Sequence, residues 1–263
     1  MWQYFPNITF GMLALWLIST YFLYLRKNGS GLAVGLHLLA TLILGVFITI
    51  LWIKLERPPL RTLAETRIWY SFFMGGIGVI LYYMYRQKWM LSYSALMGSV
   101  FILVTFFRPD SFNKTLMPAL QSVWFVPHVV VYIFAYAMLG MATVVALKGV
   151  YNYKKNQNTD NAVLIADRLV NVGYAFLTFG LLFGALWAKE AWGHYWTWDP
   201  KETWAFISWL GYLIYIHYRY KYKNTTAITA FTIIIAAFVL ILICWFGVNY
   251  LPTASQSVHT YTG

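Results

Sequence analysis

The chain has 263 residues, of which 60% are hydrophobic, 20% are aromatic and only 10% are charged. A soluble globular protein carries roughly 25% charged residues, so this composition excludes a disordered chain, a nucleic-acid-binding domain and an ordinary cytoplasmic enzyme. The net charge of +11 does not indicate nucleic acid, because the Lys and Arg residues lie between long apolar runs, where they orient membrane helices. The composition therefore predicts an all-α integral membrane protein that crosses the lipid bilayer many times.

The apolar runs predict about eight transmembrane helices. A bilayer core of about 30 Å needs about 20 apolar residues per helix, and no linker divides the runs, so we expect a single polytopic membrane domain over residues 1–263. The predicted spans are 6–24, 32–53, 68–86, 89–107, 125–147, 169–188, 203–220 and 225–247.

The Lys and Arg residues also predict the orientation of the chain. The loops after the first, third, fifth and seventh spans carry eleven of them, and the other three loops carry eight. Because Lys and Arg favour the cytoplasmic side, we expect both termini on the external (periplasmic) side. No basic residue precedes the first span, so an uncleaved first helix is expected rather than a removable signal peptide.

Tryptophan is concentrated in one external loop. Six of the 13 tryptophans fall in the 23-residue stretch 187–209, whose loop covers about residues 187–204. An interfacial aromatic belt would spread them over all helix ends, and it stays the alternative interpretation. From Trp192 to Asp199 the loop reads Trp-Gly-His-Tyr-Trp-Thr-Trp-Asp. We interpret it as a platform for a large planar aromatic ligand, in which Gly193 permits close approach.

This motif resembles the signature of the tryptophan-rich, haem-handling WWD-domain family of cytochrome c biogenesis. The residues from Pro200 to Trp204 that follow it are similar to the CcsA/ResC type, the system II cytochrome c synthase subunit. Three further segments resemble the family: a first external loop at 59–67, a histidine segment at 117–128 and a C-terminal segment at 248–261. Together these markers span about residues 58–261.

The resemblance implies haem binding, translocation and presentation at the outer membrane face, for thioether attachment to the C-x-x-C-H motifs of apocytochromes c. It implies haem b as ligand and substrate, apocytochrome c and a CcsB/ResB-type membrane subunit as partners, and no nucleic acid. The chain would then be a subunit of a holocytochrome c synthase in a bacterial inner membrane or its thylakoid-type equivalent. Two alternatives are a system I type haem transporter or chaperone, which forms no thioether and for which six spans are expected, and a haem-free scaffold or small-molecule transporter.

Two histidines are expected on the same side of the membrane as the tryptophans. His128 begins the fifth span and His259 lies in the C-terminal tail; each alone is explained as an interfacial or solvated residue. Together, two imidazoles that flank an aromatic platform suit the axial positions of haem iron, and the resemblance implies that role for both. The predicted residues that hold the macrocycle are Trp192, Gly193, Trp196, Trp198 and Asp199.

Three other histidines have weaker assignments. His217 lies about 21 Å along the seventh span, where an ionisable side chain is a functional candidate, although a place at the cytoplasmic interface beside Arg219 explains it equally well. The resemblance implies that His217 is a third haem-iron ligand. His37 could approach it geometrically, but the resemblance implies that a partner subunit supplies the second transmembrane histidine, so we interpret His37 as structural. His194 has no assigned role.

Overall fold

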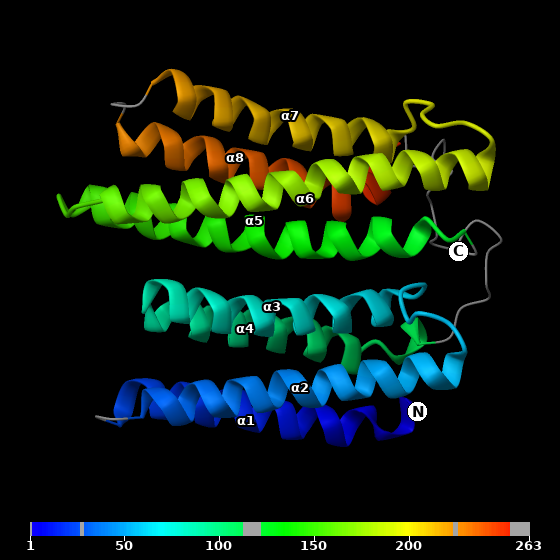
Figure 1. Ribbon diagram of the computed structural model, residues 1–263, viewed down its shortest axis with the longest axis horizontal. Coiled ribbons are helices and arrows are strands. Elements are labelled where there is room, and N and C mark those ends of the chain that lie inside the picture. Colours follow the sequence, from blue (N-terminus) through cyan, green and yellow to red (C-terminus); the bar gives the residue numbers. More distant parts are fainter. Residues whose placement is uncertain (1, 27–28, 113–121, 223–225, 253–263) are drawn as a thin grey trace. The chain divides into compact units, whose positions relative to one another are not determined.

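The computed structural model describes residues 2–26, 29–112, 122–222 and 226–252, and all regular structure in these ranges is helical (Figure 1). Three short 3-10 turns, η1 (Trp2–Tyr4), η2 (Pro109–Ser111) and η4 (Gly247–Tyr250), accompany the long helices. The long helices are α1 (Phe5–Leu25), α2 (Ser30–Leu55), α3 (Leu63–Tyr85), α4 (Lys88–Phe106), α5 (Phe125–Lys154), α6 (Asp160–Trp192), α7 (Pro200–Lys221) and α8 (Ala227–Trp245).

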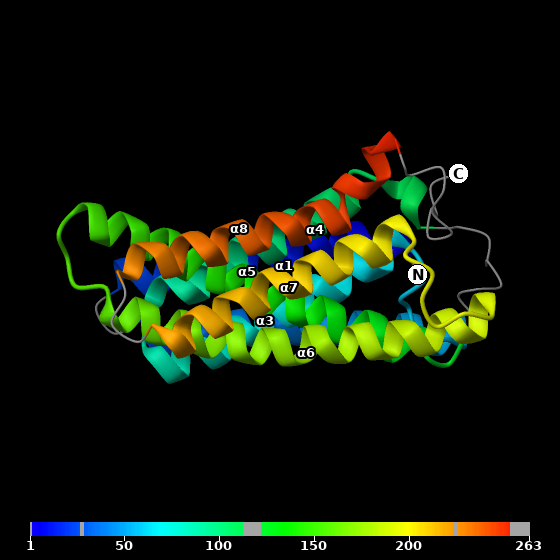
Figure 2. The same ribbon diagram turned by 90° about the horizontal axis from the view of Figure 1, so that it is seen from above.

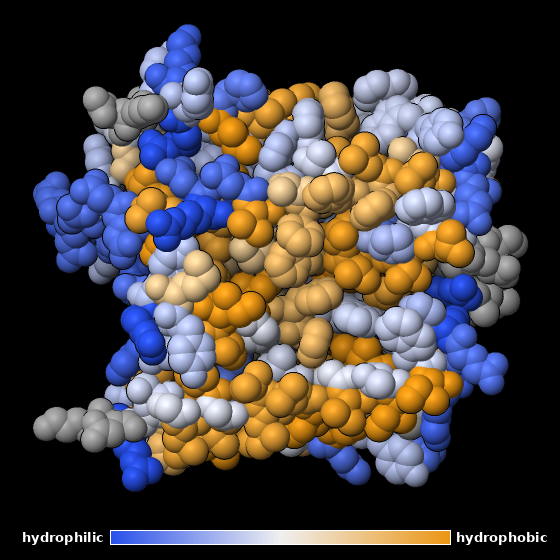
Figure 3. Space-filling view, viewed as in Figure 1, coloured by the Kyte–Doolittle hydropathy of each residue, from blue (hydrophilic) through white to orange (hydrophobic). Residues whose placement is uncertain are grey.

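Seven of these helices, all except α7, are long and apolar enough to cross a membrane. Figure 3 shows apolar side chains over the middle of the helices and hydrophilic ones toward their ends. The predicted all-α, multi-pass class is therefore confirmed. Helix α7 has 22 residues, which is long enough to cross, but Lys201, Glu202, Arg219 and Lys221 lie at its ends. Eight spans and an external position of both termini stay predictions.

Helices α5 and α6 are longer than the spans that the sequence predicts. The predicted spans 125–147 and 169–188 lie inside helices of 30 and 33 residues. At about 1.5 Å per residue α6 is about 50 Å long, well beyond a hydrocarbon core of about 30 Å. The hydropathy of the sequence predicts only the part of a helix that lies in lipid. The helix itself can continue through polar residues until a capping residue ends it.

The packing divides the chain into two compact units, residues 1–120 and residues 121–263. The N-terminal unit holds α1–α4 and the C-terminal unit holds α5–α8. Within each unit, consecutive helices pack on one another and the last packs on the first, α4 on α1 and α8 on α5; the helices of each unit run along a common direction (Figures 1 and 2). This is the neighbour order of an up-and-down four-helix bundle. The single membrane domain expected over residues 1–263 stays a prediction.

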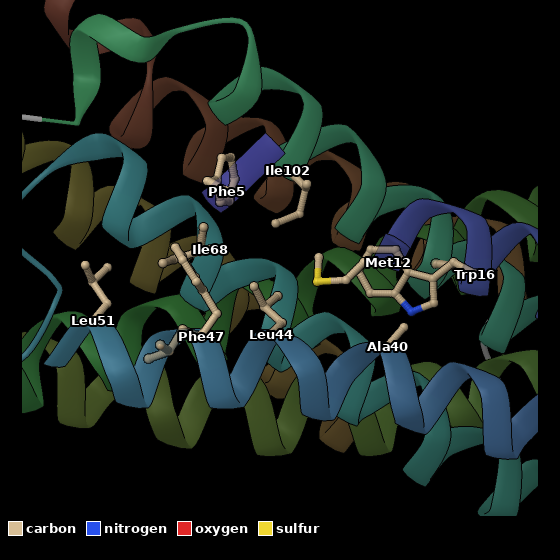
Figure 4. Close-up of a cluster of buried hydrophobic side chains, with 11 residues drawn as sticks. Phe5, Met12, Trp16, Ala40, Leu44, Phe47, Leu51, Ile68 and Ile102 are labelled. Atoms are coloured by element: carbon tan, nitrogen blue, oxygen red, sulfur yellow. The ribbon is translucent and has the colours of Figure 1, made fainter. Parts of the chain in front are cut away.

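Large apolar side chains fill the centre of the N-terminal unit (Figure 4). Met12 and Trp16 of α1 lie against Leu44 and Phe47 of α2, with Ile102 of α4 completing the cluster. Because lipid is as apolar as these side chains, close van der Waals packing rather than exclusion from water holds such a bundle together.

The loop between α2 and α3 is held by one buried carboxylate. Glu65 accepts two hydrogen bonds from the Arg57 guanidinium, at 3.0 and 2.9 Å, and one each from the backbone N–H groups of Arg61 and Thr62, at 2.6 and 3.1 Å. The Thr62 hydroxyl in turn accepts from the Glu65 N–H, which completes a capping box. The segment 59–67 is therefore a rigidly capped turn.

Candidate functional site

Helix α6 continues into the predicted tryptophan-rich loop of residues 187–204 and ends at Gly193. This residue has φ +84°, a left-handed conformation that favours glycine. Its N–H donates to the Lys189 carbonyl over 3.0 Å, and the Lys189 ammonium donates to the Gly193 carbonyl over 2.8 Å. A Cβ at this position would meet no atom within 4 Å, so glycine is needed here for its backbone conformation.

The non-helical part of the loop ends at Asp199, which caps α7. Its Oδ1 accepts from the backbone N–H groups of Lys201 at 2.8 Å and Glu202 at 3.4 Å. The Glu202 carboxylate reaches back and accepts from the N–H groups of Thr197 at 2.8 Å and Asp199 at 3.2 Å. Both acidic side chains are buried. Asp199 therefore caps the first turn of α7, and Glu202 fixes the path of the loop before it.

Trp198 lies between these two anchors in a strained conformation. Its φ is +59°, in the left-handed region that a non-glycine residue seldom adopts. The surrounding hydrogen bonds of Asp199 and Glu202 maintain it, and the indole is 61% exposed. Strain of this kind tends to occur where a side chain must be presented in one direction.

The aromatic residues around the loop form two series of ring contacts. In the first, the buried Trp187 stacks on the His128 imidazole with a centroid distance of 5.3 Å and contacts Trp192 at 4.9 Å. In the second, Trp196 meets Trp198 edge to face at 5.7 Å, and Trp198 meets Phe206 of α7 at 5.6 Å. The structure thus joins the predicted residues His128 and Trp192 through Trp187, and it joins Trp196 to Trp198 directly.

His128 is oriented by the backbone of α6. Its Nδ1 lies 2.9 Å from the Gly180 carbonyl oxygen; because a carbonyl only accepts, Nδ1 is the donor and the lone pair of the neutral ring lies on Nε2. Metal-ligating histidines characteristically donate their other N–H to a carbonyl or carboxylate. A Cβ on Gly184 would meet the His128 ring at 2.8 Å, and one on Gly180 would meet Tyr132 at 2.9 Å. The two glycines therefore make the room that lets α5 bring His128 onto α6.

His217 lies at the other end of the C-terminal unit, on α7. Its imidazole is exposed, and its Nδ1 donates to the Leu213 carbonyl over 2.9 Å. The lone pair of the neutral ring again lies on Nε2. Tyr215 and Arg219, two residues away on either side, bind Asp167 of α6.

His37 is fully buried in the N-terminal unit. Its Nε2 lies 3.4 Å from the Ser94 hydroxyl, which itself donates to the Leu91 carbonyl, and its ring contacts Trp16 with centroids 5.9 Å apart. These contacts pack His37 inside the bundle, and its structural interpretation stays a prediction.

His259 and residues 117–121 lie outside the described residues. His194 is exposed in the loop.

Sequence reasoning left Trp187, Gly184 and Glu202 out of the site. Trp187 belongs to the tryptophan-rich stretch, so its clustering was a usable signal. The spacing of Asp199 and Glu202 is that of a capping box and also could have been read from the sequence. The role of Gly184 could not have been read from the sequence, because its contact with His128 joins two different helices.

Comparison with known proteins identifies relatives over most of the chain. Residues 6–255 match the model of the cytochrome c assembly protein family. A cytochrome c biogenesis protein CcsA from Chlamydomonas reinhardtii is 31% identical over 240 residues, which cover 84% of this chain and 66% of the algal protein. Proteins of the same name from Lactuca sativa and Panax ginseng are each 33% identical, with 80% of both chains covered. The chain therefore belongs to the cytochrome c assembly protein family.

Proposed function

We propose that this chain acts in cytochrome c biogenesis by binding reduced haem at the outer membrane face and presenting it to an apocytochrome c. The observation that carries the proposal is the oriented imidazole of His128, which stacks on Trp187 and donates Nδ1–H to the Gly180 carbonyl. In this arrangement the imidazole plane is fixed against Trp187, which in turn contacts Trp192. The family relationship supports the same role.

The chemistry of the described residues suits haem as a cargo. An imidazole nitrogen is a common ligand of haem iron. Aromatic faces suit the macrocycle, and the half-exposed and exposed tryptophans Trp192, Trp196 and Trp198 offer them. The propionates need hydrogen-bond donors. Within the described ranges, the buried indole N–H of Trp196 has no acceptor, so it is available to a propionate oxygen.

Thioether formation asks for positioning rather than acid–base catalysis by this chain. Each cysteine thiol of a C-x-x-C-H segment adds across one vinyl group: an S–C bond forms at one vinyl carbon, and the thiol hydrogen ends on the other. The C=C double bond becomes a single bond, and no oxidant is consumed. The loop tied by Glu202 and Asp199 would hold the vinyl edge in place, since fixed geometry alone supplies much of the rate of such a step.

The proposed topology has eight spans, including α7, with both termini and the tryptophan-rich loop outside. In this topology His259 is the second outer axial ligand, and His217 is a ligand for haem nearer the cytoplasmic side. A CcsB/ResB-type membrane subunit would contribute the remaining ligand and a surface for the apocytochrome. The complex would form a holocytochrome c synthase in a bacterial or thylakoid-type membrane.

The test uses the full-length chain purified with the subunits that remain bound to it. We expect His128→Ala and His259→Ala each to weaken axial ligation, seen in the haem absorbance and electron paramagnetic resonance (EPR) spectra, and added imidazole to restore it. His194→Ala is the matched control, because His194 is exposed in the same loop. Haem spectra unaltered by both ligand changes contradict the proposal.

A cytochrome c maturation assay separates the two haem-handling functions. Covalent holocytochrome that requires His128 supports the synthase role. Haem that reaches an acceptor without thioether bonds indicates instead a transporter or chaperone of the system I type.

A further inference from the structure

A polar network joins α6 and α7 beside His217. The Arg219 guanidinium contacts both carboxylate oxygens of Asp167, with Nε 3.0 Å from Oδ1 and Nη2 2.9 Å from Oδ2. The Tyr215 hydroxyl donates a short hydrogen bond to Oδ1 of the same carboxylate. One carboxylate of α6 therefore holds two side chains of α7, and the two-point contact with Arg219 fixes direction as well as distance.

The network and His217 lie on opposite faces of α7. Tyr215 and Arg219 are four residues apart and so lie on one face of α7, while His217 is two residues from each, about 200° around the helix at 3.6 residues per turn. Tyr215 is buried, as are Ser208 and Tyr212 on the same packed stripe. His217 is exposed. The contacts of Asp167 thus support the packed face of α7, and His217 lies on the opposite, exposed face.

The ion pair in this network contributes little to the free energy of unfolding, because water reaches it. The side chains of Arg219 and Asp167 are 21% and 25% exposed, and both line a pocket of about 370 Å³ that is open to solvent. Ion pairs that water reaches contribute about 0–1 kcal/mol. The main effect of the network is therefore the orientation of the last turns of α7.

We propose that Asp167, Tyr215 and Arg219 are positioning residues that hold the His217 imidazole outward, where it can bind an iron centre outside its own helical unit. The proposal rests on the proposed function, in which His217 binds haem iron. The new element is that the contact between α6 and α7 sets the orientation of the His217 imidazole at the cytoplasmic side.

The experiment measures the EPR and absorbance spectra of haem at the inner site. The purified full-length chain with its bound subunits carries His128→Ala together with His259→Ala, so that both outer ligands are removed and the remaining iron signal reports on His217. Asp167→Asn and Arg219→Lys are compared with the exposed controls Arg168→Gln and Lys221→Gln. Arg219→Lys keeps the charge and loses the two-point contact, which separates orientation from electrostatics.

We expect Asp167→Asn and Arg219→Lys each to lower haem affinity at the inner site by up to about 5-fold, the limit for a contact of this exposure, and to shift the iron toward the high-spin state. Protein yield should stay unchanged, and added imidazole should restore the low-spin signal. Wild-type spectra in both variants, or a loss that imidazole does not reverse, overturn the inference. If His217→Ala also leaves the spectrum unchanged, the ligand role of His217 in the proposed function has failed and the inference fails with it.

Discussion

The imidazole of His128 on α5 is hydrogen-bonded to the main-chain carbonyl of Gly180 on α6, with Nδ1 and O separated by 2.9 Å. A backbone acceptor keeps its position whatever the neighbouring side chains are. The orientation of His128 therefore depends on how closely the two helices approach, and the small residues of α6 control that approach.

Gly184→Ala should weaken the outer haem site while the helix stays intact. The new methyl group would meet the His128 ring at 2.8 Å and push it from its contact with Gly180. We expect about 10-fold weaker haem binding, measured by haem titration of the purified protein.

Gly35→Ala is the control for this substitution, because a Cβ there meets nothing within 4 Å. Alanine is the better helix former by about 1 kcal/mol, so neither variant should lose helical structure. Equal haem binding by the two variants would show that Gly184 does not control the position of His128.

Glu202→Ala should release the tryptophan-rich loop. The carboxylate accepts from the N–H groups of Thr197 and Asp199, and the loss of such capping contacts costs about 0.5–2 kcal/mol. We expect faster proteolysis between residues 194 and 198 and a several-fold drop in cytochrome c maturation. Glu202→Gln, which retains an acceptor oxygen, should have a smaller effect, and Glu56→Gln at an exposed position should have none. A loop that is cleaved at the same rate in all of these proteins would argue against this anchor.

Trp196→Phe should weaken haem binding with little loss of stability. The substitution keeps an aromatic face and removes the indole N–H that has no acceptor within the described ranges. A hydrogen bond to a charged oxygen contributes about 1.5–3 kcal/mol, so the expected loss of affinity is about 10-fold or more. Trp69→Phe is the matched control, because its indole N–H is also buried without an acceptor in the described part of the chain. Similar affinities for both variants would exclude the Trp196 N–H as a propionate donor.

Arg57→Ala should destabilise the N-terminal unit more than any change at the protein surface. It removes both guanidinium contacts of the buried Glu65 carboxylate. A buried charge that loses its partner typically costs about 3–5 kcal/mol; the half-buried position of Arg57 places this variant at the lower end. Thermal unfolding in detergent measures the effect, with Arg26→Ala at an exposed position as the control. An unfolding temperature close to that of the control would mean that the backbone donors alone hold Glu65.

The sequence predicted the helices well because apolar runs of this length have few other structural solutions. The ends of α5 and α6 were less predictable, because Gly193 ends α6 through its backbone conformation rather than through polarity. The local parts of the site, such as the cap formed by Asp199, follow from spacing. The contact of His128 with Gly180 and that of Asp167 with Arg219 join residues 52 apart, and a single sequence contains no signal for such pairs.

The length of α6 has a consequence for the path of haem. This one uninterrupted helix carries Asp167 in its first third and Gly180 in its middle third. The two residues are 13 positions apart, which separates them by about 20 Å along the helix axis. A helix does not shorten, so the inner and outer histidines cannot close on a single iron atom held between them. In the proposed function, haem must therefore dissociate from His217 before it binds His128. The length of α6 sets the distance between these two sites.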